Sequence, residues 1–293
     1  MKKYLSLVKF SHTIFALPFA CIGFFLGVVK KGPSLRIILE REIGIKFLLV
    51  LICMVTARGA AMAFNRYLDR QFDALNPRTA IREIPAGIIA PSAALRFTIA
   101  NCLLFIIATY CINILCFYLS PIALFVILFY SYTKRFTALC HLVLGVGLSL
   151  APIGAYLAIT GVFDWLPLFF SFAVICWVSG FDIIYALQDE GFDKANTLHS
   201  IPVALGKKNA LRVSELLHLV SALLIIYAGW YGNFYWIYWI ATAVFVGMLI
   251  YQHSLVKPDD LRKVNIAFMT ANGIASVVFG ILVIVSFFIK NGW

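Results

Sequence analysis

Residues 62–73 read MAFNRYLDRQFD, and residues 181–193 read FDIIYALQDEGFD. In both stretches an apolar run ends in aspartates that are four residues apart. The apolar runs, near residues 44–64 and 166–187, are each about 20 residues long, which is the length that an α-helix needs to cross a bilayer. The two stretches therefore predict membrane-spanning helices that carry acidic residues at one end.

The composition of the whole chain also indicates a membrane protein. Of its 293 residues, 62% are hydrophobic and 13% are charged, whereas soluble proteins have about 45–50% apolar and about 25% charged residues. The net charge of +11 comes from basic residues spread through short loops, which argues against nucleic-acid binding. The seven cysteines lie in or beside apolar runs and form no CxxC pair. We therefore expect buried thiols, without disulfides or a cysteine metal site.

The apolar runs predict the fold class. We expect an all-α integral membrane protein, a single domain over residues 1–293, with about nine transmembrane helices. The boundary between the third and fourth helices is the least marked, because only Asn113 and Ser120-Pro121 interrupt the apolar sequence there. The expected helices lie near residues 11–29, 44–64, 93–112, 116–132, 138–159, 166–187, 211–230, 234–252 and 266–289.

The distribution of lysine and arginine predicts the orientation. With nine spans and a cytoplasmic N-terminus, most basic residues fall on the cytoplasmic side, as is usual for membrane proteins. The first apolar run continues to about Val29 without a small-residue cleavage site, so we expect a retained first helix and not a signal peptide. The sequence thus predicts a multi-pass protein of the bacterial inner membrane, with loops 65–92 and 188–210 in the cytoplasm.

These two cytoplasmic loops resemble each other. A duplicated half-unit is the simplest explanation, and it would place both loops on the same side of the membrane. The residues that match at an offset of 120 positions are Asp69 and Asp189, Phe72 and Phe192, Asp73 and Asp193, and Asn76 and Asn196.

Acidic residues are rare in this chain, and more than half of its 13 Asp and Glu residues lie in or just before the two loops. An ionised carboxylate near the membrane interior requires a partner. Like charges four residues apart on a helix repel, so we expect a divalent cation between the two clusters. The members of each cluster share one helix face: Asn65, Asp69 and Asp73 in the first, and Asp182, Tyr185, Asp189 and Asp193 in the second.

The chemistry of these clusters points to Mg²⁺. Oxygen ligands without histidine or cysteine select a hard cation, and Mg²⁺ typically binds one or two carboxylates together with phosphate oxygens of a substrate. Nearby basic side chains supply the donors that a diphosphate leaving group needs. These basic residues are Arg58, Arg66, Arg70, Arg78, Arg82, Lys134 and Arg135.

Two other interpretations compete with a magnesium–diphosphate site. The acidic residues could be solvated loop charges near lipid headgroups, although two matched aspartate pairs in so acid-poor a chain argue against this. A membrane transporter is the leading non-enzyme alternative, because buried charge also marks ion paths. Acid clustered at one membrane face, instead of near mid-membrane, favours the enzyme.

Four motifs together resemble the UbiA family of intramembrane aromatic prenyltransferases. Residues 65–73 fit NxxxDxxxD, and residues 182–193 fit DxxYxxxDxxxD. The other two motifs are Arg78-Thr79 with Arg82-x-x-Pro85-x-Gly87, and Tyr130-Ser-Tyr132-Thr-Lys134-Arg135. The resemblance spans nearly the whole chain. It implies nine helices around a central cavity, with a lateral opening for the isoprenoid tail in the lipid bilayer.

The resemblance also implies roles for individual residues. Mg²⁺ would bind Asp69, Asp73, Asp189 and Asp193. The diphosphate would bind Asn65, Arg58, Lys134 and Arg135. Asp182 and Tyr185 would be the catalytic residues between the diphosphate and the aromatic acceptor. His12 and His141 could each act as a general base, although a lone histidine in an apolar helix more often has a structural hydrogen bond.

The activity implied is Mg²⁺-dependent transfer of a polyprenyl group from polyprenyl diphosphate to an aromatic acid in ubiquinone or menaquinone biosynthesis. We expect 4-hydroxybenzoate as the acceptor. A dihydroxynaphthoate is the alternative, because residues 9–18 depart from the pattern common in the main 4-hydroxybenzoate enzymes. The vinyl group of protohaem is the least favoured acceptor, because that branch of the family has a differently spaced first motif.

Overall fold

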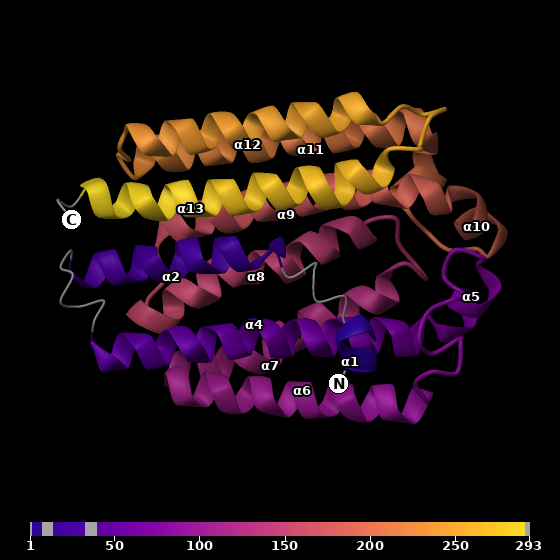
Figure 1. Cartoon of the computed structure of the whole chain (residues 1–293), viewed down its shortest axis with the longest axis horizontal. Coiled ribbons are helices and arrows are strands. Elements are labelled where there is room, and N and C mark those ends of the chain that lie inside the picture. The colour runs from indigo at the N-terminus through magenta and orange to yellow at the C-terminus, as the bar shows by residue number, and fades with distance from the viewer. Residues whose placement is uncertain (1, 8–13, 33–39, 291–293) are drawn as a thin grey trace.

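The computed structural model of the protein describes residues 2–7, 14–32 and 40–290. Within these ranges eight helices are long and apolar enough to cross a membrane, and they lie side by side along the long axis of the molecule (Figure 1). They are α4 (Arg41–Leu68), α6 (Pro91–Ile112), α7 (Ile114–Thr133), α8 (Cys140–Thr160), α9 (Trp165–Ala186), α11 (Ile201–Tyr231), α12 (Trp236–Leu255) and α13 (Asn272–Lys290), the last preceded by a π-helical stretch, Ile266–Ala271.

A further helix, α2 (Leu17–Lys31), lies alongside these eight and packs against α8 and α13. It has 15 residues. The part of the expected first helix that precedes it, including His12, falls outside the described residues. The prediction of an all-α membrane bundle with about nine helices is confirmed, and the protein is a multi-pass membrane protein.

The seventh expected helix is longer than predicted. α11 begins at Ile201 and not near residue 211, so the loop after the second motif is shorter than expected. The Ser200 hydroxyl caps the first turn of α11 by accepting from the Val203 N–H. Pro202 is tolerated in that turn because a residue there has no helical acceptor for its N–H, so proline loses no hydrogen bond. Gly206, with φ 74°, then kinks the helix. The apolar run alone did not reveal this polar first part of the helix.

Asn113 separates the third and fourth expected helices as predicted. Its side chain accepts from the Cys116 N–H at 2.8 Å and so caps α7, while its amide donates to the Leu157 carbonyl of α8 at 2.9 Å. Pro121, in contrast, lies inside α7 and does not interrupt it. The Ser120 hydroxyl donates to the Phe117 carbonyl, which Pro121 leaves without its usual helical donor.

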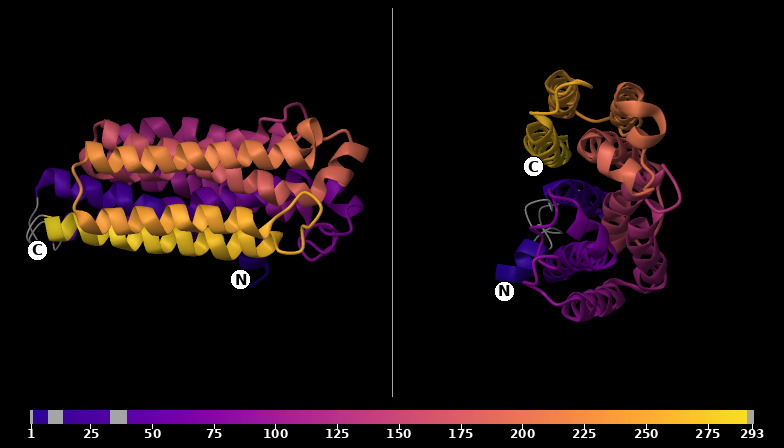
Figure 2. Two further views of the ribbon diagram at one scale, coloured as in Figure 1. Left: turned by 90° about the horizontal axis from the view of Figure 1, so that it is seen from above. Right: turned by 90° about the vertical axis from the view of Figure 1, so that its right-hand side faces the viewer.

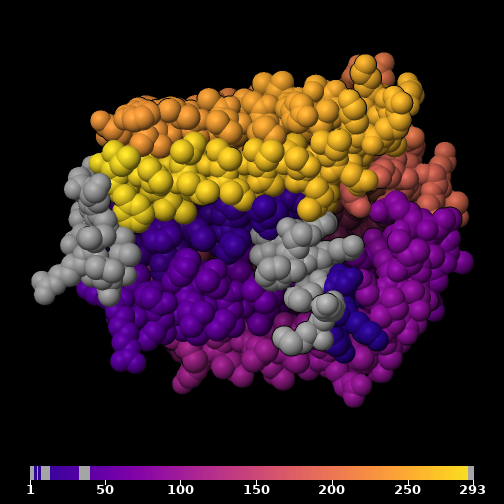
Figure 3. All heavy atoms as spheres, viewed as in Figure 1, coloured from indigo at the N-terminus to yellow at the C-terminus, as the bar shows by residue number. Residues whose placement is uncertain are grey.

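The helices pack through small residues and a core of aromatic rings. α9 packs extensively against both α8 and α11. Trp177 of α9 is fully buried and makes tilted and edge-on ring contacts with Phe19 and Phe245, and its indole N–H donates to the Asn272 side chain at 2.9 Å. This cluster ties α2, α9, α12 and α13 together; α2 and α13 lie side by side on the face shown in Figure 3.

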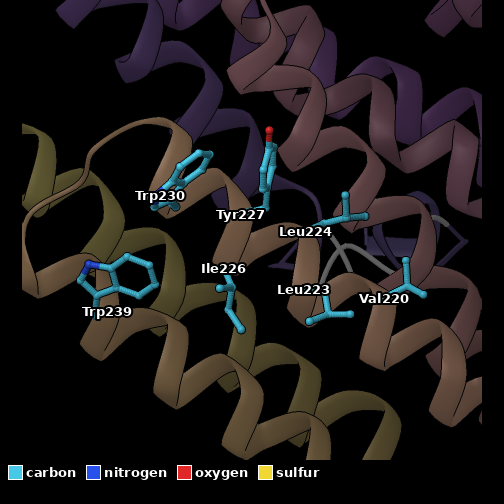
Figure 4. Close-up of a pocket in the computed structure, with 7 residues that line it drawn as sticks. All are labelled: Val220, Leu223, Leu224, Ile226, Tyr227, Trp230 and Trp239. Carbon is cyan, nitrogen blue, oxygen red and sulfur yellow. The ribbon is translucent and has the colours of Figure 1, made fainter.

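The outer surface of the bundle is apolar. On α6, for example, Ile99, Leu103 and Ile107 are all exposed at four-residue spacing, as a lipid-facing helix requires. An apolar groove on α11 and α12 runs along this outer surface and includes Tyr227, Trp230 and Trp239 (Figure 4). It contains no polar cluster and none of the expected site residues.

The acidic motifs both lie at one end of the bundle. Two short helices, α5 (Arg70–Leu75) and α10 (Glu190–Ala195), follow α4 and α9 and meet at the end opposite the last turn of α13 (Figures 1 and 2). This arrangement requires the two loops to lie on the same side of the membrane.

The contact between α2 and α8 gives a test of the packing. A methyl group at Gly23 would lie 1.9 Å from the Pro152 carbonyl oxygen, so we expect Gly23→Ala to destabilise the protein by roughly 1–3 kcal/mol, the usual effect of overpacking. Gly247→Ala is the matched control, because nothing lies within 4 Å of its added methyl. Thermal unfolding in detergent should show a lower midpoint for Gly23→Ala alone; equal midpoints would show that α2 does not pack against α8 as described.

Candidate active site

The first acidic motif lies where α4 passes into α5. The backbone leaves helical geometry at Asp69, with φ −87° and ψ 6°. Backbone hydrogen bonds nevertheless continue across this break, from the Asp69 N–H to the Asn65 carbonyl at 2.9 Å and from the Asp73 N–H to the Asp69 carbonyl at 2.8 Å. The motif therefore keeps its residues on one face, and the Asn65 amide donates to the Asp69 carboxylate at 3.0 Å.

The second acidic motif has the same construction. α9 passes through a 3₁₀ turn, Leu187–Asp189, into the six-residue helix α10. Like α5, α10 is preceded by an aspartate and followed by an asparagine, at positions 120 residues later. The duplication of the two halves stays a prediction, although the two helix ends are alike in form.

The loop after α5 folds back toward the second motif. The Asn76 side chain accepts from the Arg78 N–H at 3.0 Å and so forms a turn around Pro77. The Thr79 hydroxyl donates to the Asp73 carbonyl at 3.1 Å and fixes the same turn. This turn brings the Arg78 guanidinium to the carboxylate of Asp189, with Nε 3.0 Å from Oδ1 and Nη2 on Oδ2.

All four motif aspartates are paired with basic side chains. Two pairs join the first motif to its surroundings, and two lie at the second motif. The Asp69 carboxylate lies 2.9 Å from Arg135 Nη2, and the carboxylate of Asp73 lies 2.6 Å from Arg82 Nη1. The other two pairs are Asp189 with Arg78, and Asp193 with Lys134 at 2.7 Å.

Two of these carboxylates are buried inside the protein. Asp73 is 5% exposed and Asp193 is fully buried. In the described part of the chain, the Oδ2 atoms of both residues are buried without a hydrogen-bond partner. Burial also raises the pKa of Asp69, against the opposing attraction of Arg135. A buried carboxylate oxygen without a partner is costly, so the site has a remaining capacity for positive charge.

The described residues hold no ready-made cluster of three or more His, Cys, Asp or Glu side chains around one point. The candidate metal donors are instead four separate aspartate carboxylates, each paired with an arginine or lysine side chain. Such a set fits Mg²⁺ that takes one or two carboxylates and completes its shell with phosphate oxygens. It does not fit a site formed by protein ligands alone.

Asp182 and Tyr185 lie on α9, before the second motif. The Tyr185 hydroxyl accepts from Arg78 Nη1 at 3.0 Å, and its ring packs on Phe268 with the centroids 4.3 Å apart. Asp182 lies 2.7 Å from Nδ1 of His141. The structure thus joins Tyr185 directly to the charged network, whereas Asp182 has a histidine as its partner.

Arg58, Lys134 and Arg135 come from two helices. Lys134 is the C-cap of α7 and Arg135 follows it, so both lie at the end of the bundle with the acidic motifs. Arg58 lies within α4, seven residues before Asn65, which places it about 10 Å further along the helix axis. Arg58 is therefore the deepest of the expected diphosphate-binding residues.

Arg78 and Arg82 are more central than the sequence indicated. They were expected as part of a family motif and as donors to the diphosphate, and the structure also pairs them with one aspartate from each acidic motif. The available signal was the turn sequence Asn76-Pro77, which reverses the chain so that residues far from Asp189 in sequence reach it. His141, for which a structural hydrogen bond was the more common expectation, makes that bond to a candidate site residue.

Comparisons with known proteins point to one family. A family model described as UbiA prenyltransferase family matches residues 16–274. The 4-hydroxybenzoate octaprenyltransferase of Tolumonas auensis is 29% identical over 76% of this chain and 77% of its own length. The enzyme of the same name from Nitrosospira multiformis is 28% identical and covers 81% of both chains.

Solved structures show the same fold. The apo structure of a UbiA homolog from Aeropyrum pernix K1 has a TM-score of 0.82 and 29% identity, and covers 94% of this chain and 97% of its own. A UbiA homolog from Archaeoglobus fulgidus, bound to DMAPP and Mg²⁺, has a TM-score of 0.76 and 21% identity over 97% of this chain and 99% of its own. The family model spans nearly all of the described bundle, and the fold agrees with it. The chain belongs to the UbiA prenyltransferase family and is an integral-membrane prenyltransferase.

Proposed function

We propose that this protein transfers a polyprenyl group from polyprenyl diphosphate to a ring carbon of 4-hydroxybenzoate, with Mg²⁺, in quinone biosynthesis. The observation that carries the proposal is the meeting of four aspartates from two distant motifs at one end of the bundle, each beside a basic side chain. The names of the relatives support the acceptor. The match to a family of transferases leaves the transporter alternative without support.

Asp69, Asp73, Asp189 and Asp193 would hold Mg²⁺, and Asn65 would bind beside them. The buried, unpartnered oxygens of Asp73 and Asp193 within the described ranges support this assignment. When bound, Mg²⁺ neutralises charge that develops on the departing diphosphate. The site resembles the magnesium–diphosphate sites in which carboxylates and substrate phosphate share the ion.

The basic residues would exchange partners when substrate binds. Lys134 and Arg135 pair with Asp193 and Asp69. Once a divalent cation neutralises these carboxylates, the same side chains are available to donate to diphosphate oxygens. Arg58, deeper in α4, would bind the diphosphate from the side of the prenyl carbon. The ion pairs thus keep the cations close to the position where the leaving group needs them.

The acceptor would lie near Asp182 and Tyr185, on the membrane side of the diphosphate. The Tyr185 ring and its neighbour Phe268 present aromatic faces there, and such faces stabilise a developing allylic cation. The surrounding apolar helices exclude water that would otherwise capture the cation. The ring carbon of the acceptor then attacks, and loss of a proton restores aromaticity.

We further propose that the end of the bundle with the acidic motifs faces the cytoplasm, with the N-terminus on the same side of the bacterial inner membrane. Lys134, Arg135, Arg78 and Arg82 gather at this end, as the preference for basic residues on the cytoplasmic side requires. Water-soluble 4-hydroxybenzoate would then reach the site from the cytoplasm, while the polyprenyl tail stays in the bilayer.

Loss of either acidic motif should remove the activity. We expect Asp69→Ala or Asp189→Ala to lower prenyl transfer by about 100-fold or more, the usual effect of removing electrostatic stabilisation of a leaving group. Asp260→Ala is the control, because Asp260 forms its ion pair in the described ranges with its near neighbour Arg262, away from the two acidic motifs. Transfer is measured in membranes that contain equal amounts of inserted protein. Full activity in both site variants would remove the assignment of the metal site.

Metal and diphosphate should bind together. Mg²⁺ alone should shift the thermal midpoint of the detergent-solubilised protein little, since the carboxylates are held by cations. Mg²⁺ with a polyprenyl diphosphate at about 100 times its Kd should stabilise the protein by about 2.7 kcal/mol. Asp193→Ala should lose this shift. The full shift with Mg²⁺ alone would contradict this arrangement of separate carboxylates, because the protein would then bind the metal tightly without substrate phosphate.

The acceptor can be identified directly. Membranes containing the protein are incubated with one labelled polyprenyl diphosphate and a panel of aromatic acceptors, and the products are separated. We expect label in prenylated 4-hydroxybenzoate. Label in a prenylated dihydroxynaphthoate would replace the proposed acceptor but keep the chemistry, whereas label in neither, under conditions where the diphosphate binds, would overturn the proposed function.

A further inference from the structure

Asp182 differs from the other aspartates at this end of the bundle in its partner. Each motif aspartate lies beside an arginine or lysine, whereas His141 is the partner of Asp182 within ion-pair distance in the described ranges. Asp182 is therefore set apart from the proposed metal ligands, and its side chain is 22% exposed, so a substrate can reach it.

The position of His141 is fixed by backbone packing. His141 lies in the first turn of α8 and is 3% exposed. The Ser179 hydroxyl of α9 donates to the His141 carbonyl at 3.1 Å. One turn further, Gly145 lets α8 approach α9 so closely that a Cβ there would lie 2.5 Å from the Ile175 carbonyl oxygen. The distance between His141 and Asp182 is thus set by the contact between two helices, not by flexible side chains.

The hydrogen bonds of His141 define its role. The Ile201 N–H, at the start of α11, donates to Nε2 of His141 at 3.4 Å. Nδ1, on the other side of the ring, lies 2.7 Å from Oδ2 of Asp182 and donates to it. The ring therefore lies between a backbone N–H and the carboxylate, and it holds Oδ2 of Asp182 in place.

Asp182 also lies at a suitable depth. It precedes Tyr185 by one turn and Asp189 by seven residues on the same helix path, so it lies about 10 Å from Asp189 along the axis. Diphosphate held by Asp189 and its neighbours would occupy the outer part of this interval, and the reacting carbon would follow it. Asp182 is thereby placed beside the acceptor ring and away from the leaving group.

We propose that Asp182 accepts the proton that the acceptor ring loses, and that His141 is the positioning residue that holds Asp182 for this step. The proposal rests on the proposed function. The bond between prenyl C1 and the diphosphate oxygen breaks, with its electron pair leaving on diphosphate, and a ring π pair forms the new carbon–carbon bond. The C–H bond at the new ring substituent then breaks. Its electron pair returns to the ring, and the proton passes to Oδ1 of Asp182 and later to water.

Kinetic measurements test the role of His141. We expect His141→Leu to lower kcat by about 10- to 100-fold, part of the effect that general-base catalysis usually supplies, and Asp182→Asn by about 100-fold or more. The KM for polyprenyl diphosphate and the Mg²⁺ dependence should stay as in the unmodified protein. His141→Asn, whose amide can donate from nearly the same place as Nδ1, should recover part of the loss.

An isotope effect separates this role from a structural one. With 4-hydroxybenzoate deuterated at the ring carbons beside the hydroxyl, the unmodified enzyme should show little isotope effect, because proton loss follows a slower step. His141→Leu and Asp182→Asn should show a clear primary effect, because their proton loss has become slow. Ser179→Ala is the matched control: it removes a hydrogen bond to the backbone of His141 and should lower the thermal midpoint without creating an isotope effect.

The outcomes distinguish this inference from the proposed function. If the unmodified protein prenylates no aromatic acceptor, the proposed function fails. If it turns over but His141→Leu keeps its kcat within about twofold, far below the usual contribution of a general base, His141 is not a positioning residue. Absence of an isotope effect in an active Asp182→Asn variant would remove Asp182 as the proton acceptor. Should His141→Leu fail to insert, His141→Asn and Asp182→Asn still decide the question by the same measurement.

Discussion

The structure depends on the pairing of buried carboxylates with cations at one end of an apolar bundle. An ionised aspartate at the edge of a membrane is stable only when an opposite charge or a metal lies beside it. Asp69, Asp73, Asp189 and Asp193 each have such a partner. Because these partners come from α7 and from the loop after α5, the pairing also fixes how the two motifs lie relative to each other.

This pairing explains why the ordered loops lie where they do. Ile84 and Ile89 pack residues 76–90 against Ala63 of α4, while Arg78 and Arg82 attach the same segment to the carboxylates of Asp189 and Asp73. The turn at Asn76 and the hydroxyl of Thr79 then hold the backbone that carries both arginines. The same charges that prepare the site for a diphosphate therefore fold the segment that covers it.

Much of this arrangement could be predicted from local sequence. Aspartates four residues apart at the end of an apolar run were enough to predict a helix end with a charged face, and Asn113 fell between the expected ends of α6 and α7, although that boundary was the least marked. The partner of each aspartate could not be predicted, because ion pairs such as Asp193 with Lys134 join residues that are far apart in sequence. The start of α11 was missed for a different reason: its first turns depend on the cap at Ser200 and a kink at Gly206, which carry no apolar periodicity.

The difference between Asp182 and the motif aspartates follows from the same physical constraint. Near the end of the bundle, arginine and lysine side chains can reach both water and the carboxylates, so the charges there are balanced by full cations. One to two turns deeper, the partner of Asp182 in the described ranges is the imidazole of His141. The partner of each aspartate thus separates the proposed metal ligands from the proposed proton acceptor.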